Sequence, residues 1–114
     1  MFDFQNLEVY KKAKAFHLEC KSLILTQKTD NYVKDQLGRA SFSIVLNIAE
    51  GSGKFSKPDR RNYFVIARGS VFECVAILDI LHDIKVVHTD ALSNYLKNAD
   101  ELSCMLYAMI KNLS

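Results

Sequence analysis

The chain has 114 residues, of which 49% are hydrophobic and 25% are charged, a composition typical of one globular domain. Its longest uncharged stretch is residues 40–49, which is too short and too polar for a transmembrane span or a signal peptide, so we expect no membrane association and a cytoplasmic location. The three cysteines and three histidines have no zinc-ligand or catalytic spacing, and we expect no metal or cofactor. Cys20 and Cys74 fall on apolar faces, where packing is the better interpretation.

Apolar residues spaced by three and four predict helices throughout the chain. The first helix is expected over about residues 7–27, with a buried seam at Val9, Ala13, Phe16, Cys20 and Leu23. Leu7, Leu18 and Leu25 fall on the opposite side among lysines. They are either scattered exposed leucines or a second contact surface.

The second helix is expected from residue 30 or 31 to residue 50, ended by Gly51. Its polar side chains fall in one narrow strip: Gln36, Arg39, Ser43, Asn47 and Glu50. No nucleophile stands beside a base there, so we interpret the strip as a structural polar network, within or between subunits, and expect Asn47 to be inaccessible and hydrogen-bonded. The rest of the circumference of this helix is apolar. This apolar surface is wider than the stripe that one core needs, which predicts a subunit interface.

The third helix is expected to start with Ser56 as N-cap, Pro58 in the first turn and Asp59 at the capping-box position, and to run to about residue 86. The fourth is expected to start at residue 89 or 90. Four amphipathic helices with short connections predict an all-α, up-down-up-down four-helix bundle, with residues 1–114 as a single domain.

Residues 47–63 form the chain's one dense Gly, Ser and Pro cluster. A phosphate loop is excluded because Phe55 follows Gly53-Lys54, Ile48 takes the place of the first glycine, and a helix precedes. We therefore interpret the segment as a helix connection whose glycines supply unusual backbone angles.

Charge is unevenly distributed. Residues 1–68 hold 12 Lys and Arg against 7 Asp and Glu, whereas residues 69–114 hold 3 against 6. Five cations gather around the start of the third helix: Lys54, Lys57, Arg60, Arg61 and Arg68. Cations oppose the helix dipole at an N-terminus, so this group either meets an anionic partner or is a solvated loop. No base-reading set and no exposed aromatic platform is evident, so any nucleic-acid binding is expected to be largely independent of sequence.

Three segments carry a family resemblance: LEVYKKA (7–13), QLGRASFSIVLNIAEGSG (36–53) and YFVIARGSVFEC (63–74). They resemble the four-helix-bundle proteins encoded in intervening sequences of bacterial 23S ribosomal RNA genes, over nearly the whole chain. The middle segment is the most specific. Val45 departs from the family pattern, where proline is common, and Cys74 stands where leucine is frequent.

The resemblance implies a homopentamer, with relatives that include the nucleic-acid-contacting accessory protein of diversity-generating retroelements. It carries over no catalytic residues to this chain. We therefore expect a non-enzymatic homo-oligomer that binds RNA or DNA, preferably RNA, through the five cations, supported by lysines of the first helix. The alternative is a protein-binding adaptor that docks a partner protein with Leu7, Leu18 and Leu25.

Overall fold

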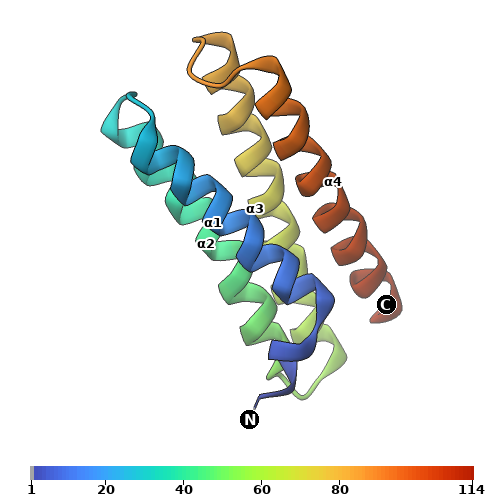
Figure 1. Cartoon of the computed structure of the whole chain (residues 1–114). Helices are drawn as coiled ribbons and strands as arrows, with labels where there is room; N and C mark the ends of the chain where they lie inside the picture. The colour runs from blue at the N-terminus through green and yellow to red at the C-terminus, as the bar shows by residue number, and fades with distance from the viewer. Residues whose placement is uncertain (1) are drawn as a thin grey trace.

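The computed structural model describes residues 2–114 as four antiparallel helices, which confirms the predicted four-helix bundle (Figure 1). The helices are α1 (Glu8–Thr26), α2 (Asn31–Ser52), α3 (Lys57–Asp83) and α4 (Thr89–Asn112), and a short 3-10 helix, η1 (Asp3–Asn6), precedes them. The N-terminal segment and the loop between α2 and α3 lie at the same end of the molecule. No helix in residues 2–114 has an apolar stretch long enough to cross a membrane.

The core forms where the apolar spacing places it. All five residues of the predicted seam on α1 are buried. On α3 the apolar spacing selects Tyr63, Phe64, Ala67, Ser70, Val71, Cys74, Leu78 and Leu81, and all of these are buried except Tyr63, which is half-buried. Cys20 and Cys74 are fully buried, as predicted. Burial raises the pKa of the Cys20 thiol to about 12 and also raises that of Cys74, so both thiols pack as small apolar groups.

The glycines near the end of α2 do not have the role predicted for them. The helix continues through Gly51 to Ser52, and Gly53, its C-cap, has an ordinary φ of −89°. No glycine of residues 2–114 has a positive φ. Gly51 is instead needed for close packing, because a Cβ there would lie 2.9 Å from both Phe64 Cε1 and Tyr63 Cβ.

The end of α3 also differs from the expectation, since the helix stops at Asp83 rather than near residue 86. Lys85 adopts a left-handed conformation, with a φ of 64°. The Lys85 amide donates to the His82 carbonyl at 3.0 Å, and the Val86 amide donates to the Leu81 carbonyl at 2.9 Å. This pair of bonds is a Schellman motif, which ends the helix without the glycine that such a position favours.

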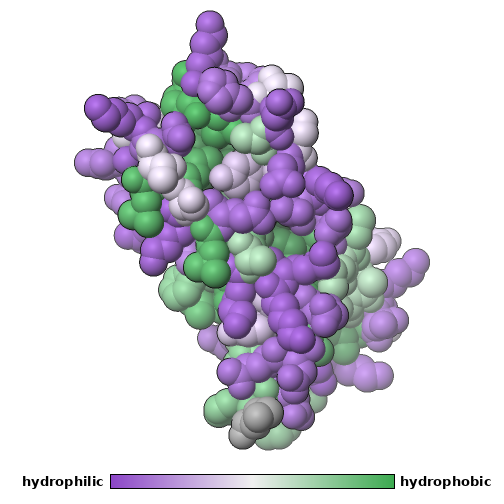
Figure 2. Space-filling view, viewed as in Figure 1, coloured by the Kyte–Doolittle hydropathy of each residue, from purple (hydrophilic) through white to green (hydrophobic). Residues whose placement is uncertain are grey.

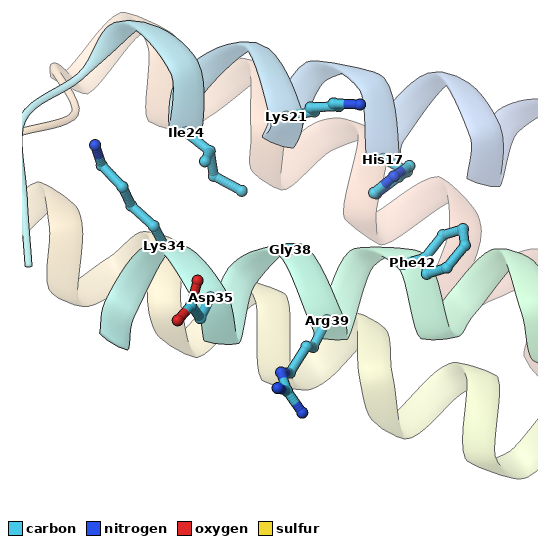
Figure 3. A pocket seen from close by; sticks show the side chains of 8 residues that line it. All are labelled: His17, Lys21, Ile24, Lys34, Asp35, Gly38, Arg39 and Phe42. Atoms are coloured by element: carbon cyan, nitrogen blue, oxygen red, sulfur yellow. The ribbon is translucent and has the colours of Figure 1, made fainter. Parts of the chain in front are cut away.

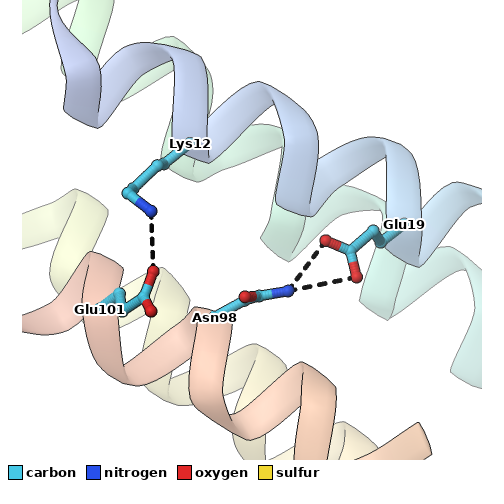
Figure 4. Close-up of polar contacts among 4 residues, drawn as sticks. All are labelled: Lys12, Glu19, Asn98 and Glu101. Carbon is cyan, nitrogen blue, oxygen red and sulfur yellow. Dashed lines mark hydrogen bonds and ion pairs between the residues drawn. The ribbon is translucent and has the colours of Figure 1, made fainter.

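Polar contacts join α1 to α4 (Figure 4). Lys12 Nζ lies 2.7 Å from Glu101 Oε2, and Asn98 Nδ2 donates to both oxygens of Glu19, at 3.0 and 3.3 Å. The Lys12 partner lowers the pKa of Glu101, and Glu101 in turn raises the pKa of Lys12. These contacts join the first and last helices at the surface of the bundle.

The side of α2 that faces away from the core carries exposed apolar side chains beside the charged Asp35, Arg39 and Glu50. Phe42 and Leu46 are each about half exposed there, next to half-buried Ala49; we call these three residues the outer face of α2. Apolar side chains also show through the mainly polar surface in Figure 2. The single subunit thus covers one side of α2 and leaves the other uncovered, as its broad apolar pattern predicts.

Candidate nucleic-acid interface

The connection between α2 and α3 is short and has a fixed backbone. Its first residues continue from the helix, with the Gly53 amide donating to the Glu50 carbonyl at 3.1 Å and the Lys54 amide to the Gly51 carbonyl at 3.2 Å. At its other end Ser56 Oγ accepts a 3.2 Å bond from the Asp59 amide, so Ser56 is the predicted N-cap. Helix packing at Gly51 and capping at Ser56 therefore hold the loop in one place.

Four of the five predicted cations gather around this loop: Lys54, Lys57, Arg60 and Arg61, which we call the basic end. The Lys54 ammonium lies over the ring of Tyr63, 5.1 Å from its centroid. Arg61 Nε donates to Ser114 Oγ at 3.1 Å, which ties the basic end to the C-terminus of the bundle. Arg60 Nε is shielded from solvent and has no hydrogen-bond partner among residues 2–114.

Arg68 lies two helical turns farther along α3 and has contacts of its own. Its guanidinium lies 4.9 Å from the ring centroid of Phe72 and 5.4 Å from that of Tyr107. Its Nε donates to the Ser103 carbonyl at 3.3 Å. Arg68 therefore joins α3 to α4, and of the five predicted residues it is the one most engaged within the subunit.

The lysines of α1, expected to support the basic residues, have separate partners. Lys11 pairs with Glu8 at 3.6 Å, Lys12 pairs with Glu101, and Lys14 lies over the ring of Tyr10 at 5.1 Å. Lys21 instead lines an open groove between α1 and α2 (Figure 3). Most of the α1 lysines thus stabilise the bundle surface locally.

That groove has a volume of about 590 Å³ and is mainly basic. Its lining residues are His17, Lys21, Ile24, Lys34, Asp35, Gly38, Arg39 and Phe42. His17 Nδ1 lies 2.8 Å from Ser41 Oγ, and burial, followed by the charge of Lys21, lowers the pKa of His17, so the imidazole is neutral at pH 7. Lys34 contributes to the groove although it stands outside every sequence motif; only the packing of α1 on α2 brings it near Lys21.

The predicted polar strip of α2 is divided between two surroundings. Asn47 Nδ2 donates to the Ser43 carbonyl at 2.8 Å and to Ser43 Oγ at 2.9 Å, and Ser43 Oγ accepts a 3.0 Å bond from Ser70 on α3. Gln36 Nε2 donates to Glu73 of α3 at 3.1 Å. Ser43 and Gln36 thus form polar contacts between α2 and α3 inside the subunit, and Asn47 bonds to Ser43 within α2.

The two charged residues of the strip are exposed. Arg39 lines the basic groove, and Glu50 faces Tyr63 and raises the pKa of its hydroxyl by hydrogen bonding. Asn47 is half-buried in the single subunit, and its burial in an assembly stays a prediction.

Among residues 2–114, no three His, Cys, Asp or Glu side chains converge in the way that a metal site requires.

Exposed aromatic rings are the feature that the sequence interpretation missed. Phe55 is fully exposed in the loop of the basic end, and Phe2, which lines a hollow with Gly53 and Lys54 of that loop, is 70% exposed. The expectation that no aromatic platform is exposed is therefore wrong. The sequence shows only that Phe55 stands between Lys54 and Lys57 and outside both helical patterns, which places the ring in the loop and leaves its exposure open.

The fold and the basic end together define a helical-bundle protein with four Lys and Arg side chains gathered around one loop. The model of the 23S rRNA-intervening sequence protein family matches residues 5–108, and the chain belongs to this family. No curated protein is similar enough to match.

A solved structure has the same fold. It is the 1.70 Å crystal structure of a protein of unknown function from the S23 ribosomal protein family of Bacteroides thetaiotaomicron VPI-5482. The TM-score is 0.85 at 21% identity, over 90% of this chain and 98% of that one. At this identity the similarity shows the fold alone.

Proposed function

We propose that the protein is a non-enzymatic homo-oligomer, a pentamer, that binds nucleic acid, RNA in preference, through its basic end. The observation that carries this proposal is the group formed by Lys54, Lys57, Arg60 and Arg61. The ion pairs found within residues 2–114 are Lys11–Glu8 and Lys12–Glu101, and neither involves this group. Unpaired cations at one end of a bundle suit phosphate groups better than they suit helix stability.

The chemistry of the basic end favours backbone recognition over base reading. Its Lys and Arg side chains offer ammonium and guanidinium donors, which bind phosphate oxygens whatever the sequence. One subunit supplies only about four such contacts, too few for tight binding on its own. Repeating the basic end around an oligomer links weak contacts and raises the apparent affinity without any new kind of contact.

The outer face of α2 supports assembly. Phe42 and Leu46 are about half exposed on the side of α2 that the subunit does not cover. Neighbouring apolar side chains left exposed on a helix that is already buried on its other side are typical of an interaction surface. We place the subunit contact on this face.

Light scattering after size exclusion tests the assembly. We expect a mass about five times the 13.0 kDa of the chain, and we expect Leu46→Glu to lower it, because a carboxylate would be buried in the contact. Leu25→Glu is the matched control, since Leu25 is an exposed leucine on α1. A wild-type monomer at micromolar concentration would overturn the assembly, and an unchanged mass for Leu46→Glu would overturn its location.

Titrations of labelled single-stranded RNA and duplex DNA at low salt test the binding. We expect the Arg60→Glu/Arg61→Glu variant to bind much more weakly than wild type. Its control is Lys28→Glu/Lys97→Glu, which has the same change in net charge away from the basic end. If both variants lose affinity equally, net charge alone governs binding and the basic end is not the site.

A protein-binding adaptor is the second candidate function. Leu18 and Leu25 are 61% and 74% exposed and stand two helical turns apart on α1, with Leu7 less exposed at its start. An exposed leucine row of this kind suits an apolar helix or groove of a partner protein. Absence of wild-type nucleic-acid binding at low salt would favour this function.

A further inference from the structure

Phe55 is an apolar ring held in solvent by an ordered loop. Only three other residues, Gly53, Lys54 and Ser56, separate α2 from α3, and the bonds at Gly53, Lys54 and Ser56 described above fix both ends of this loop. The ring is nevertheless fully exposed, whereas nearby Tyr63 is half-buried and carries the Lys54 ammonium over its face. Both faces of the Phe55 ring are therefore free for a ligand.

The segment around this ring, residues 54–61, holds four cations and one carboxylate, Asp59. Lys54 and Lys57 flank Phe55 in the chain, and Arg60 and Arg61 follow within the first turns of α3. Proteins that bind single strands without sequence preference combine positive groups that follow the backbone with aromatic rings on which bases stack. The basic end has both parts within eight residues, 54–61.

We infer that Phe55 is a stacking platform for an unpaired base, and that the protein binds single-stranded nucleic acid in preference to duplex. This inference rests on the proposed nucleic-acid binding. In a duplex the base faces are already stacked on one another, so a duplex gains only the phosphate contacts. A single strand gains the phosphate contacts and also the stacking of a base on the Phe55 ring.

The neighbouring surface fits this ligand better than it fits an apolar pocket of a protein. The residues beside Phe55 are Lys54 and Ser56, not other apolar side chains. A hollow of about 580 Å³ next to the loop is lined by Phe2 and Lys54 and also by the carboxylates of Asp3 and Glu50. The hollow thus joins a second exposed ring, Phe2, to one lysine and two carboxylates, a lining with three charged groups that does not suit an apolar protein segment.

The test compares the full-length wild type with Phe55→Ala and Phe55→Trp. The ligands are a labelled 20-nucleotide single-stranded RNA, an abasic strand of the same length, and a duplex. We expect Phe55→Ala to weaken binding of the RNA by about 5- to 100-fold at each site, and to leave the abasic strand and the duplex unaffected. The slope of affinity against salt should not change, because no cation is removed.

Phe55→Trp supplies a direct readout, because the chain contains no other tryptophan. We expect its fluorescence to be quenched by the RNA and not by the abasic strand. Equal RNA affinity of wild type and Phe55→Ala, or equal quenching by both strands, would overturn the inference while leaving phosphate binding by the basic end intact. Wild type that binds neither strand nor duplex at low salt would overturn the inference and the proposed function together.

Discussion

Replacing Gly51 by alanine tests whether the close approach of α2 to α3 is a packing requirement. The new Cβ would lie 2.9 Å from Phe64 Cε1 and Tyr63 Cβ and 3.1 Å from Phe64 Cδ1, against 3.5–4.0 Å for an ordinary carbon contact. Phe64 is only 1% exposed, so its ring cannot give way by turning out into solvent. Overpacking of this kind costs about 1–3 kcal/mol of the free energy of unfolding.

The helix propensity of alanine works in the opposite direction. Alanine is favoured over glycine by up to about 1 kcal/mol inside a helix, and by less at Gly51, the second-last residue of α2. Gly69→Ala is the matched control, because Gly69 lies inside α3 and its Cβ would meet nothing within 4 Å. We expect Gly51→Ala to be destabilised and Gly69→Ala to be unchanged or stabilised, with a difference of roughly 2 kcal/mol.

Urea unfolding followed by circular dichroism at 222 nm measures both variants. The midpoints should move in opposite directions, or only the Gly51→Ala midpoint should fall, with the slope m unchanged. If Gly51→Ala is as stable as Gly69→Ala, then the backbone relaxes around the methyl group and the account of Gly51 is wrong.

Three further changes test other parts of the account. Asn47→Leu removes the donor to Ser43 and should lower the free energy of unfolding by about 1 kcal/mol, since Asn47 is only half-buried; an unchanged melting temperature and oligomer size would contradict this. Lys85→Gly relieves the left-handed φ of 64° and should raise the melting temperature by roughly 4 °C, and no rise would mean that lysine is unstrained there. Burial lowers the pKa of folded His17 below the unfolded value of 6.5, so the unfolded chain binds more protons below that pH. The free energy of unfolding should therefore be level above pH 6.5 and decrease as the pH drops from 6.5 towards the folded pKa of His17. The His17→Gln variant, measured beside wild type from pH 7 to pH 5, should show a smaller decrease, because it lacks the titrating imidazole.

The sequence predicted best what depends on periodicity. The seam from Val9 to Leu23 and the face of α3 follow from side-chain spacing alone, because a helix must bury one stripe whatever packs against it. The role of Gly51 could not be found in this way. A glycine near a helix end is typical of a cap, and only the position of Phe64 on another helix shows that it is a contact point.

The candidate site was predictable in its charge and not in its shape. Lys54, Lys57, Arg60 and Arg61 are close in sequence, so their grouping needs no tertiary information. Arg68 shares a helix face with Arg61, but the aromatic partners that engage it depend partly on α4, through Tyr107. The exposure of Phe55 depends on the loop path, since an aromatic residue in a loop is as compatible with burial as with exposure.

The salt dependence of RNA binding by wild-type protein tests the central claim most directly. Four cations that neutralise four phosphates of a single strand predict a slope of about −3 in the logarithm of the association constant against the logarithm of salt concentration. Contacts from several subunits to one strand would make the slope steeper. A slope near zero, or no binding at low salt, would contradict the assignment of the basic end as a nucleic-acid interface.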